Sequence, residues 1–210
     1  MKIIEKIQFI THSASEKDIY KQTNAMIENG IKWIQFRMKD TSFEKKLPIA
    51  RNLKEICSKN NVKLIINDDV EIARIIKADG IHLGLEDCNP IDARRILGED
   101  TIIGGTCNTY EQIIRRNEQG VDYIGLGPYK FTSTKKNLSP IISLSGYKNI
   151  LKQMKENNIN IPIIGIGGIE INDISQIINT GVYGIALSSL LIRSNNLHKD
   201  IEIINNAINH

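Results

Sequence analysis

The chain has 210 residues, of which 41% are hydrophobic, and a formal net charge of +3. This length and composition can supply one substantial core, so we expect a single domain over residues 1–210. The small net charge, with basic residues scattered among acidic ones, argues against a nucleic-acid partner. No apolar run approaches the roughly 18 residues of a membrane span, and the first residues lack the apolar stretch of a signal peptide. We therefore expect a soluble, cytoplasmic protein without a membrane partner.

Apolar runs alternate with segments of helical periodicity along the whole chain. Eight runs are predicted to be strands, at residues 7–11, 33–37, 63–67, 80–83, 101–104, 123–126, 162–166 and 184–187. Polar N-cap residues indicate helix starts at Ser15, Asn89, Thr109 and Asn172. Glycines that end a helical segment just before a strand recur at Gly30, Gly120 and Gly181.

This regular alternation decides the predicted fold class. Strands that alternate with helices imply a parallel sheet, and eight such units favour a closed (β/α)₈ barrel, the TIM barrel, over an open doubly wound sheet. Residues just beyond the C-terminal ends of the barrel strands then face a common site. The longest segment without a clear pattern, residues 127–145, is a candidate functional loop.

Carboxylates directly follow two neighbouring predicted strands. Asp68 and Asp69 come after residues 63–67, and Asp87 follows residues 80–83. Mg²⁺ is commonly held by one or two carboxylates, with its other ligands drawn from water and substrate phosphates. The spacing therefore predicts a Mg²⁺ site for a diphosphate. The alternative is that these acids are ordinary turn residues, which often follow strands.

Positively charged side chains follow the second predicted strand. Gln35, Arg37 and Lys39 alternate along the sequence and would point the same way on extended backbone. Arginine can bind phosphate oxygens with two parallel hydrogen bonds, and lysine supplies a compact charge. The pattern indicates an anion site, with a solvated strand end as the alternative.

Three later loops have the composition of phosphate sites. Residues 127–136 combine hydroxyls, backbone amides and lysines, the glycines at 165–168 leave backbone amides accessible, and Ser188 and Ser189 could open a short helix. Phosphate sites of TIM barrels commonly use the loops after strands seven and eight. The alternatives are an ordinary polar loop and a glycine turn needed only for tight packing.

Six motifs occur together in the order and approximate spacing of one known family. They are Gln35-Phe36-Arg37-Met38-Lys39, Ile66-Asn67-Asp68-Asp69, the segment from Gly80 to Asp87, Gly125-Leu126-Gly127-Pro128, the segment from Thr132 to Lys136, and Gly165-Ile166-Gly167-Gly168. With these motifs, nearly the whole chain resembles the thiamine-phosphate synthase family, whose barrels also include thiazole tautomerases. The resemblance implies an enzyme that joins 4-amino-5-hydroxymethyl-2-methylpyrimidine diphosphate to a thiazole phosphate. Thiamine phosphate and diphosphate would be the products, and Mg²⁺ the cofactor.

The resemblance also implies a role for each matching position. Asp68 and Asp87 would be the Mg²⁺ ligands. The groups around the pyrimidine diphosphate would be Gln35, Arg37, Lys39, Asn67 and Lys135, of which Arg37, Lys39 and Lys135 would act as catalytic groups on the departing diphosphate. Thr106 would contact the pyrimidine. The thiazole phosphate would be bound by Thr132, Thr134, Gly168, Ser188 and Ser189.

The chain departs from the common family pattern in the loop after the fifth strand and at Ser188. Thr106 stands where serine is more usual, Asn108 stands where many relatives have histidine, and Ser188 stands where relatives often have an apolar residue. The tautomerase branch uses a histidine in this fifth loop, so Asn108 and the retained diphosphate residues favour a synthase. A tautomerase and a non-catalytic barrel that binds thiamine or phosphate are the alternatives.

The remaining expectations concern cysteines and partners. The three cysteines, Cys57, Cys88 and Cys107, have neither zinc-site spacing nor an even number, and are interpreted as free thiols of a reducing compartment. Cys107 has no histidine partner nearby in sequence, so we interpret it as a small buried residue and not as a nucleophile. The expected partners are small-molecule substrates, and a homodimer is compatible with the sequence.

Overall fold

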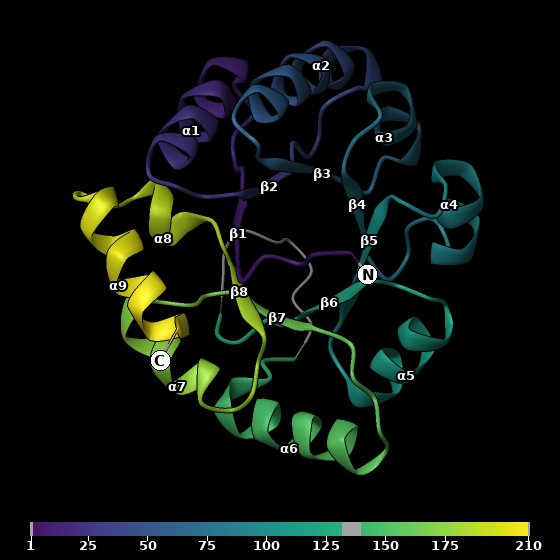
Figure 1. Cartoon of the computed structure of the whole chain (residues 1–210), viewed down its shortest axis with the longest axis vertical. Coiled ribbons are helices and arrows are strands. Elements are labelled where there is room, and N and C mark those ends of the chain that lie inside the picture. The colour runs from purple at the N-terminus through teal and green to yellow at the C-terminus, as the bar shows by residue number, and fades with distance from the viewer. Residues whose placement is uncertain (1, 132–139, 210) are drawn as a thin grey trace.

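The computed structural model, which describes residues 2–131 and 140–209, is a closed barrel of eight parallel strands (Figure 1). Each strand pairs with the next along the chain, and β8 pairs with β1. The strands are β1 Ile7–Ile10, β2 Trp33–Phe36, β3 Lys63–Asn67, β4 Gly80–Leu83, β5 Ile102–Cys107, β6 Tyr123–Leu126, β7 Ile163–Ile166 and β8 Gly184–Leu187. The predicted (β/α)₈ fold is confirmed.

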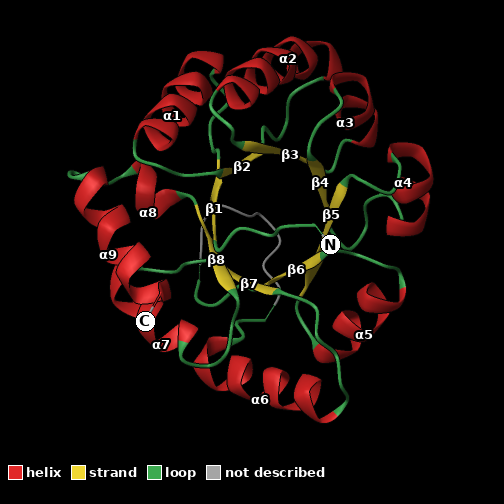
Figure 2. Cartoon of the chain, in the orientation of Figure 1, coloured by secondary structure: helices red, strands yellow, loops and turns green. Residues whose placement is uncertain are grey.

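Helices form an outer ring around the strands (Figure 2). Their bounds are α1 Glu16–Glu28, α2 Phe43–Lys59, α3 Val70–Ile76, α4 Pro90–Leu97, α5 Tyr110–Glu118, α6 Ser143–Glu156, the 3₁₀ helix η1 Ile171–Asp173, α7 Ile174–Ile178, α8 Ser189–Ile192 and α9 Leu197–Asn209. None of the helices in the described part of the chain has the length and apolarity to cross a membrane.

Most of the predicted element boundaries are confirmed by the structure. The side chains of Ser15, Asn89 and Thr109 each accept a backbone N–H at the start of a helix. The prediction at Asn172 was wrong, because this residue lies inside η1. The cap position is Glu170, whose backbone N–H donates to the Asp173 carboxylate at 3.0 Å.

The fifth strand is longer than predicted, because the pair Gly104-Gly105 continues the strand instead of ending it. Gly104 pairs with Tyr123, and Gly105 pairs with Ile124, in register along β6. A Cβ on Gly104 would overlap the Tyr123 ring. The glycine is therefore a packing requirement inside the barrel, where a large ring lies against the neighbouring strand.

Two apolar layers hold the barrel together. The strand faces that point outward pack against the helices, whereas the inward faces fill the barrel interior with Ile10, Trp33, Ile65, Tyr123 and Ile164. Each such side chain stabilises the fold by about 1.5–3 kcal/mol when fully buried. The interior is thus a packed core and not a channel, which confines ligands to the strand ends.

The N-terminal ends of the strands carry a repeated ion-pair device. Asp79 accepts the backbone N–H of Leu64 at 2.8 Å and pairs with Lys54 of α2 at 2.7 Å. Asp122 does the same two strands later, with the N–H of Ile103 and with Arg94 of α4, both at 2.7 Å. Both acids directly precede a strand, so each fastens its own strand to the neighbouring strand and to a helix.

The first residues of the chain also reach this end of the barrel. In Figure 1 the chain runs from β1 across the barrel opening to a point beside β5 and β6. There Lys2 donates to the Thr101 carbonyl at 2.8 Å and pairs with Asp122 at 3.0 Å. The N-terminal face is therefore fastened by charge pairs, which leaves the opposite face for a functional site.

Candidate active site

Two carboxylates, Asp68 and Asp87, lie side by side at the C-terminal ends of β3 and β4. Burial alone would raise the pKa of Asp68, but hydrogen bonds with Asp87 and Lys39 hold it below its ordinary value. Burial, the hydrogen bond that protonated Asp87 donates to Asp68, and the negative charge of Asp68 raise the pKa of Asp87 to about 6. The pair behaves as like charges in close contact, one of which keeps its proton more tightly.

The backbone around Asp68 is arranged to present this carboxylate. Asp68 has a φ of 66°, in the left-handed region that non-glycine residues rarely adopt and that is frequent at functional sites. Its N–H donates to the carbonyl of His82 on β4 at 2.9 Å. The left-handed turn therefore places Asp68 next to the loop that carries Asp87.

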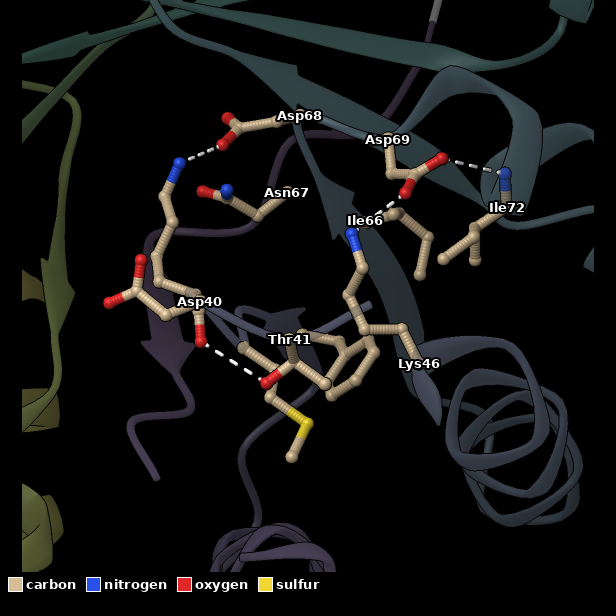
Figure 3. Close-up of a pocket in the computed structure, with 11 residues that line it drawn as sticks. Asp40, Thr41, Lys46, Ile66, Asn67, Asp68, Asp69 and Ile72 are labelled. Atoms are coloured by element: carbon tan, nitrogen blue, oxygen red, sulfur yellow. Dashed lines mark hydrogen bonds and ion pairs between the residues drawn. The ribbon is translucent and has the colours of Figure 1, made fainter. Parts of the chain in front are cut away.

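Asp69 has a different role from its neighbour. Its side chain accepts the Ile72 N–H at 3.1 Å as the N-cap of α3 and pairs with Lys46 at 2.8 Å. Figure 3 shows the Asp69 carboxylate turned away from the Asp68 carboxylate and the Asn67 carboxamide, which point to the same side. The turn-residue alternative thus describes Asp69, whereas Asp68 caps no helix and contacts Asp87 and Lys39.

Positive charge surrounds the carboxylate pair. The ammonium of Lys39 forms an ion pair with Asp68, and both residues line a small cavity of about 110 Å³ together with Asn67. Arg37 lies beside them: burial lowers its pKa, and the charges of Asp68 and Asp40 act in the opposite direction. Arginine stays charged under such a shift. Lys46, Asp40 and Asp69 also line this cavity, so it combines cations with carboxylates, and such a mixture suits a metal-bound polyanion.

The loop after β4 is fixed by two residues that the sequence motifs did not assign. The N–H of Gly84 donates to the Asp87 carboxylate at 2.6 Å, and a Cβ on Gly84 would lie 2.6 Å from the same oxygen. Arg116 of α5, a buried residue, donates to the Gly84 carbonyl. The sequence signal was present, because Arg116 lies three residues after Ile113 on the buried face of α5.

The carboxylate pair fits Mg²⁺ as the predicted cofactor. Both donors are hard oxygens, and two carboxylates in contact favour a cation between them over a shared proton at neutral pH. Across residues 2–131 and 140–209, no group of three or more His, Cys, Asp and Glu side chains could hold a metal ion. With Asp68 and Asp87 as its ligands, a bound Mg²⁺ would take its other ligands from water and a diphosphate.

Gln35 and Thr106 approach the site from inside the barrel. Gln35 is buried and donates from Nε2 to Gln8 Oε1 at 3.1 Å. Thr106 Oγ1 lies 3.0 Å from Nε2 of His82. Sequence reasoning assigned no role to Gln8 or His82, although both are polar residues at strand positions whose neighbours along the chain are apolar.

The described residues of the predicted phosphate cup lie where the loops after β7 and β8 meet the start of the loop after β6. Gly167 and Gly168 have φ of 93° and 68°. A Cβ on Gly168 would lie 2.7 Å from the Phe131 carbonyl, so only glycine fits this turn. Gly168 and Ser189 line one cavity of about 620 Å³, which also includes Arg193.

Ser188 lies next to this cavity, at the end of β8. Its Oγ is buried and has no hydrogen-bond partner among the residues that the structure describes. Its carbonyl accepts the N–H groups of Leu191 and Ile192, which starts α8 as predicted. Three other predicted residues, Thr132, Thr134 and Lys135, lie outside the described residues.

Two residues near the site have structural roles. Asn108 donates from Nδ2 to the Gly127 carbonyl, which joins the loop after β5 to the start of the loop after β6. Cys107 is buried, and burial raises the pKa of its thiol to about 12. A thiol with so high a pKa is a poor nucleophile, as predicted for a small buried residue.

Nearly the whole barrel, from β1 into α8, matches the model of one known protein family. The family model for thiamine monophosphate synthase matches residues 7–191. The chain belongs to this family. Among its relatives, the thiamine-phosphate synthase of Bacteroides thetaiotaomicron is 47% identical, with 90% of each chain covered. That of Flavobacterium psychrophilum is 43% identical, with 97% of this chain and 98% of the relative covered.

A solved structure supports the same assignment for this member of the thiamine monophosphate synthase family. Thiamine phosphate pyrophosphorylase from Pyrococcus furiosus superposes with a TM-score of 0.82 at 25% identity, over 97% of this chain and 95% of the other. The 3-hexulose-6-phosphate synthase structure, at 11% identity and a TM-score of 0.71, shares only the fold. The resemblance inferred from six motifs is confirmed.

Proposed function

We propose that this family member joins 4-amino-5-hydroxymethyl-2-methylpyrimidine diphosphate to a thiazole phosphate, with Mg²⁺ as cofactor, and releases thiamine phosphate and diphosphate. The family match and the relatives at 43–47% identity make it a thiamine-phosphate synthase, a transferase that acts on small molecules. The contact between Asp68 and Asp87 carries the finer proposal, because two adjoining carboxylates beside Lys39 suit a diphosphate leaving group bound with a metal ion.

The reaction is proposed to begin with loss of the leaving group. The bond between the pyrimidine methylene carbon and the diphosphate oxygen breaks, and its electron pair leaves with the diphosphate. The aminopyrimidine ring stabilises the resulting carbocation. The thiazole nitrogen then donates its lone pair to the methylene carbon, which forms the new C–N bond and the thiazolium charge. No protein nucleophile takes part, so the residues act through position and charge.

The proposed site residues differ in the ligand group that each one contacts. Asp68 and Asp87 would hold Mg²⁺, which when bound neutralises negative charge on the departing diphosphate. Arg37, Lys39 and Lys135 would stabilise the same charge as catalytic groups. The remaining proposed substrate contacts are Gln35, Asn67 and Thr106 for the pyrimidine diphosphate and Thr132, Thr134, Gly168, Ser188 and Ser189 for the thiazole phosphate.

Two alternatives are less well supported. A thiazole tautomerase needs neither a metal-binding carboxylate pair nor a leaving-group clamp, and Asn108 here binds a backbone carbonyl instead of supplying an imidazole. A non-catalytic barrel would not need the left-handed backbone that presents Asp68.

We further propose that residues 1–210 form one domain, that the enzyme is cytoplasmic, and that it forms a homodimer.

The experiment that tests the function incubates purified protein with both substrates and Mg²⁺ and measures thiamine phosphate and diphosphate by mass spectrometry. Asp87→Asn should lose Mg²⁺-dependent turnover by roughly 10²-fold or more. The matched control is Asp92→Asn, since Asp92 lies in an exposed ion pair with Arg95 on α4 and should leave turnover unchanged. Absence of product above an enzyme-free control would contradict the proposal, as would full activity of Asp87→Asn across a Mg²⁺ titration.

A further inference from the structure

A chain of hydrogen bonds crosses the barrel interior beside the proposed pyrimidine site. Gln35 Nε2 donates to Gln8 Oε1 at 3.1 Å, and Gln8 Nε2 donates to the Tyr123 hydroxyl at 3.3 Å. The same hydroxyl lies 3.0 Å from His82 Nδ1, and His82 Nε2 lies 3.0 Å from Thr106 Oγ1. The chain therefore connects two proposed pyrimidine contacts, Gln35 and Thr106, through the side chains of Gln8, Tyr123 and His82.

The barrel makes space for this chain at two strand positions. A Cβ on Gly104 would overlap the Tyr123 ring, and a Cβ on Gly125 would lie 2.9 Å from His82 Cε1. Glycine inside a strand costs roughly 0.5–1 kcal/mol relative to alanine because it loses more backbone entropy on folding. The two aromatic rings can cross the interior only because β5 and β6 lack side chains there.

The chain of hydrogen bonds also places polar side chains in the buried barrel interior, where an unpaired polar group is costly. Gln8, Gln35 and Tyr123 are no more than 2% exposed, and the edge of Trp33 packs on Tyr123 with ring centroids 4.9 Å apart. A buried polar group without a partner costs about 1–3 kcal/mol, whereas apolar side chains would fill a barrel interior without this risk. Stability alone therefore does not explain why polar residues occupy these positions.

The hydrogen bonds of the chain run in one direction. Burial raises the pKa of the Tyr123 hydroxyl, so this group keeps its proton. Gln8 already donates to this hydroxyl, so the arrangement that uses every group has the Tyr123 proton donated to Nδ1 of a neutral His82. The imidazole then carries its proton on Nε2 and donates it to Thr106 Oγ1. As a result, Thr106 can donate its hydroxyl proton to a ligand, and Gln35 can accept through its carbonyl oxygen.

We propose that Gln8, Tyr123 and His82 are positioning residues that fix Gln35 as an acceptor and Thr106 as a donor, and that this polarity selects an aminopyrimidine ring. The proposal rests on the proposed function. An aminopyrimidine presents N–H donors on its exocyclic amine and an acceptor on the adjacent ring nitrogen. The corresponding 4-oxo ring presents the reverse pattern, an oxygen acceptor beside an N–H donor. Gln35 as an acceptor and Thr106 as a donor therefore match the aminopyrimidine, whereas they do not match the 4-oxo ring.

The first test measures selectivity by binding. Isothermal titration calorimetry with Mg²⁺ compares the pyrimidine diphosphate with its 4-oxo analogue on the wild-type protein and on Tyr123→Phe. The wild type should prefer the amino compound by about 100-fold, the equivalent of two hydrogen bonds. Tyr123→Phe keeps the ring against Trp33 but breaks the chain, so the preference should fall by about 10-fold, the equivalent of one hydrogen bond.

A matched control separates positioning from stability. Tyr147 is another buried tyrosine, and its hydroxyl donates to the Leu126 carbonyl at 2.8 Å, outside the chain. Tyr147→Phe should lower the melting temperature and leave the preference for the amino ring unchanged. If Tyr123→Phe weakens both ligands equally and keeps the wild-type preference, Tyr123 has only a structural role and the proposal is wrong.

A second measurement leaves all of the hydrogen-bonded residues, from Gln35 to Thr106, unchanged. Long-range ¹⁵N–¹H NMR correlations on histidine-labelled protein identify the tautomer of each neutral imidazole. The other three signals are assigned from variants of exposed His12, exposed His198 and the terminal His210. His82 should be the tautomer with its proton on Nε2. A proton on Nδ1 would reverse the chain and overturn the inference.

The two proposals fail in different ways. A wild-type protein that forms no thiamine phosphate from both substrates contradicts the proposed function. A wild-type protein that forms thiamine phosphate, but whose ring preference survives Tyr123→Phe, contradicts only the positioning chain.

Discussion

Arg116 on α5 donates a hydrogen bond of 2.6 Å from its guanidinium to the backbone carbonyl of Gly84. The N–H of the same glycine donates to Asp87, also at 2.6 Å. The two polar groups of one glycine thus connect a buried cation in the helical ring to a proposed Mg²⁺ ligand. Gly105 on β5 leaves room for this connection, because a Cβ there would lie 3.1 Å from Cδ of Arg116.

The first prediction concerns this connection. Arg116→Met keeps an unbranched side chain but removes the hydrogen bond, so the loop that carries Asp87 should be less well fixed. Loss of a buried hydrogen bond from a charged donor should cost about 1–3 kcal/mol of stability, and the Mg²⁺ concentration for half-maximal activity should rise about 10-fold, because such outer partners tune metal affinity. Chemical denaturation and a Mg²⁺ titration of turnover check both effects.

The matched control is Arg115→Met, since the side chain of Arg115 is exposed one position earlier on the same helix. It should change stability by less than about 0.5 kcal/mol and leave the Mg²⁺ dependence as in the wild type. An Arg116→Met protein with normal Mg²⁺ dependence would show that the connection only stabilises the fold.

The second prediction follows from the pKa of Asp87, about 6 in the folded protein against an ordinary 3.8. Between these values the folded state binds the proton more tightly than the unfolded chain does. The stability that this proton contributes is complete below about pH 3.8 and is lost as the pH rises through 6. Asp87→Asn resembles the protonated form at every pH. Without Mg²⁺ it should therefore be more stable than the wild type at pH 8, and equally stable near pH 4.

The expected gain at pH 8 is about 1 kcal/mol, because Asp87 is only partly buried and solvent screens much of the repulsion. Urea denaturation at both pH values in the presence of a chelator measures it. The same substitution should abolish Mg²⁺-dependent turnover, so one variant gains stability and loses activity. A variant less stable than the wild type at pH 8 would mean that the carboxylate pair does not repel.

How far the sequence predicted the molecule depended on the range of the interactions involved. The eight strands and most caps are local patterns, set by side-chain alternation and by residues within one helical turn. Asp68 and Asp87 could be paired because neighbouring strands of a parallel barrel end at the same face. The cap prediction was wrong at Asn172, because the buried Asp173 carboxylate accepts the Glu170 N–H and the helical turn therefore begins after Glu170.

The supporting residues of the site were not predicted, because their partners lie far away along the chain. Tyr123 has an aromatic ring that fits any strand, and its hydroxyl acquires a role only when Gln8, 115 residues earlier, lies within hydrogen-bond distance. Arg116 lies on the buried face of α5, but its partner, the Gly84 carbonyl, is 32 residues earlier in the chain. Only closure of the barrel brings such groups together.

The third prediction separates stability from activity at the other end of the barrel. Asp122 neutralises Lys2 and Arg94 and accepts the Ile103 N–H. Asp122→Asn leaves two partly buried cations without an anion and should cost about 2–3 kcal/mol. Turnover per folded molecule should be unchanged, because the proposed site lies at the opposite strand ends. Urea denaturation and kinetics below the transition measure both, with the exposed Asp100→Asn as the control of near-zero cost. Loss of turnover in the folded Asp122→Asn protein would contradict this separation of faces.

The last prediction concerns the start of the loop after β6. Lys130 lies 2.8 Å from both carboxylate oxygens of Asp173, which is 4% exposed. The N–H groups of Tyr129 and Lys130 donate to the carbonyls of Ile166 and Gly167, both at 2.9 Å. The ion pair therefore fastens the start of this loop to the glycine turn of the proposed thiazole-phosphate cup.

Lys130→Met keeps the length of the side chain but leaves the Asp173 carboxylate without its cation, so the glycine turn should shift relative to the loop. The KM for the thiazole phosphate should rise about 10-fold, whereas the KM for the pyrimidine diphosphate should stay within about twofold, because a small misplacement weakens only the contacts that it reaches. Steady-state kinetics with each substrate varied in turn measures both values. Lys152→Met is the matched control, since Lys152 forms an exposed pair with Glu156 at 3.8 Å on α6 and should alter neither constant. Equal changes in both KM values would show that Lys130 affects the barrel as a whole and not the glycine turn that its ion pair with Asp173 holds.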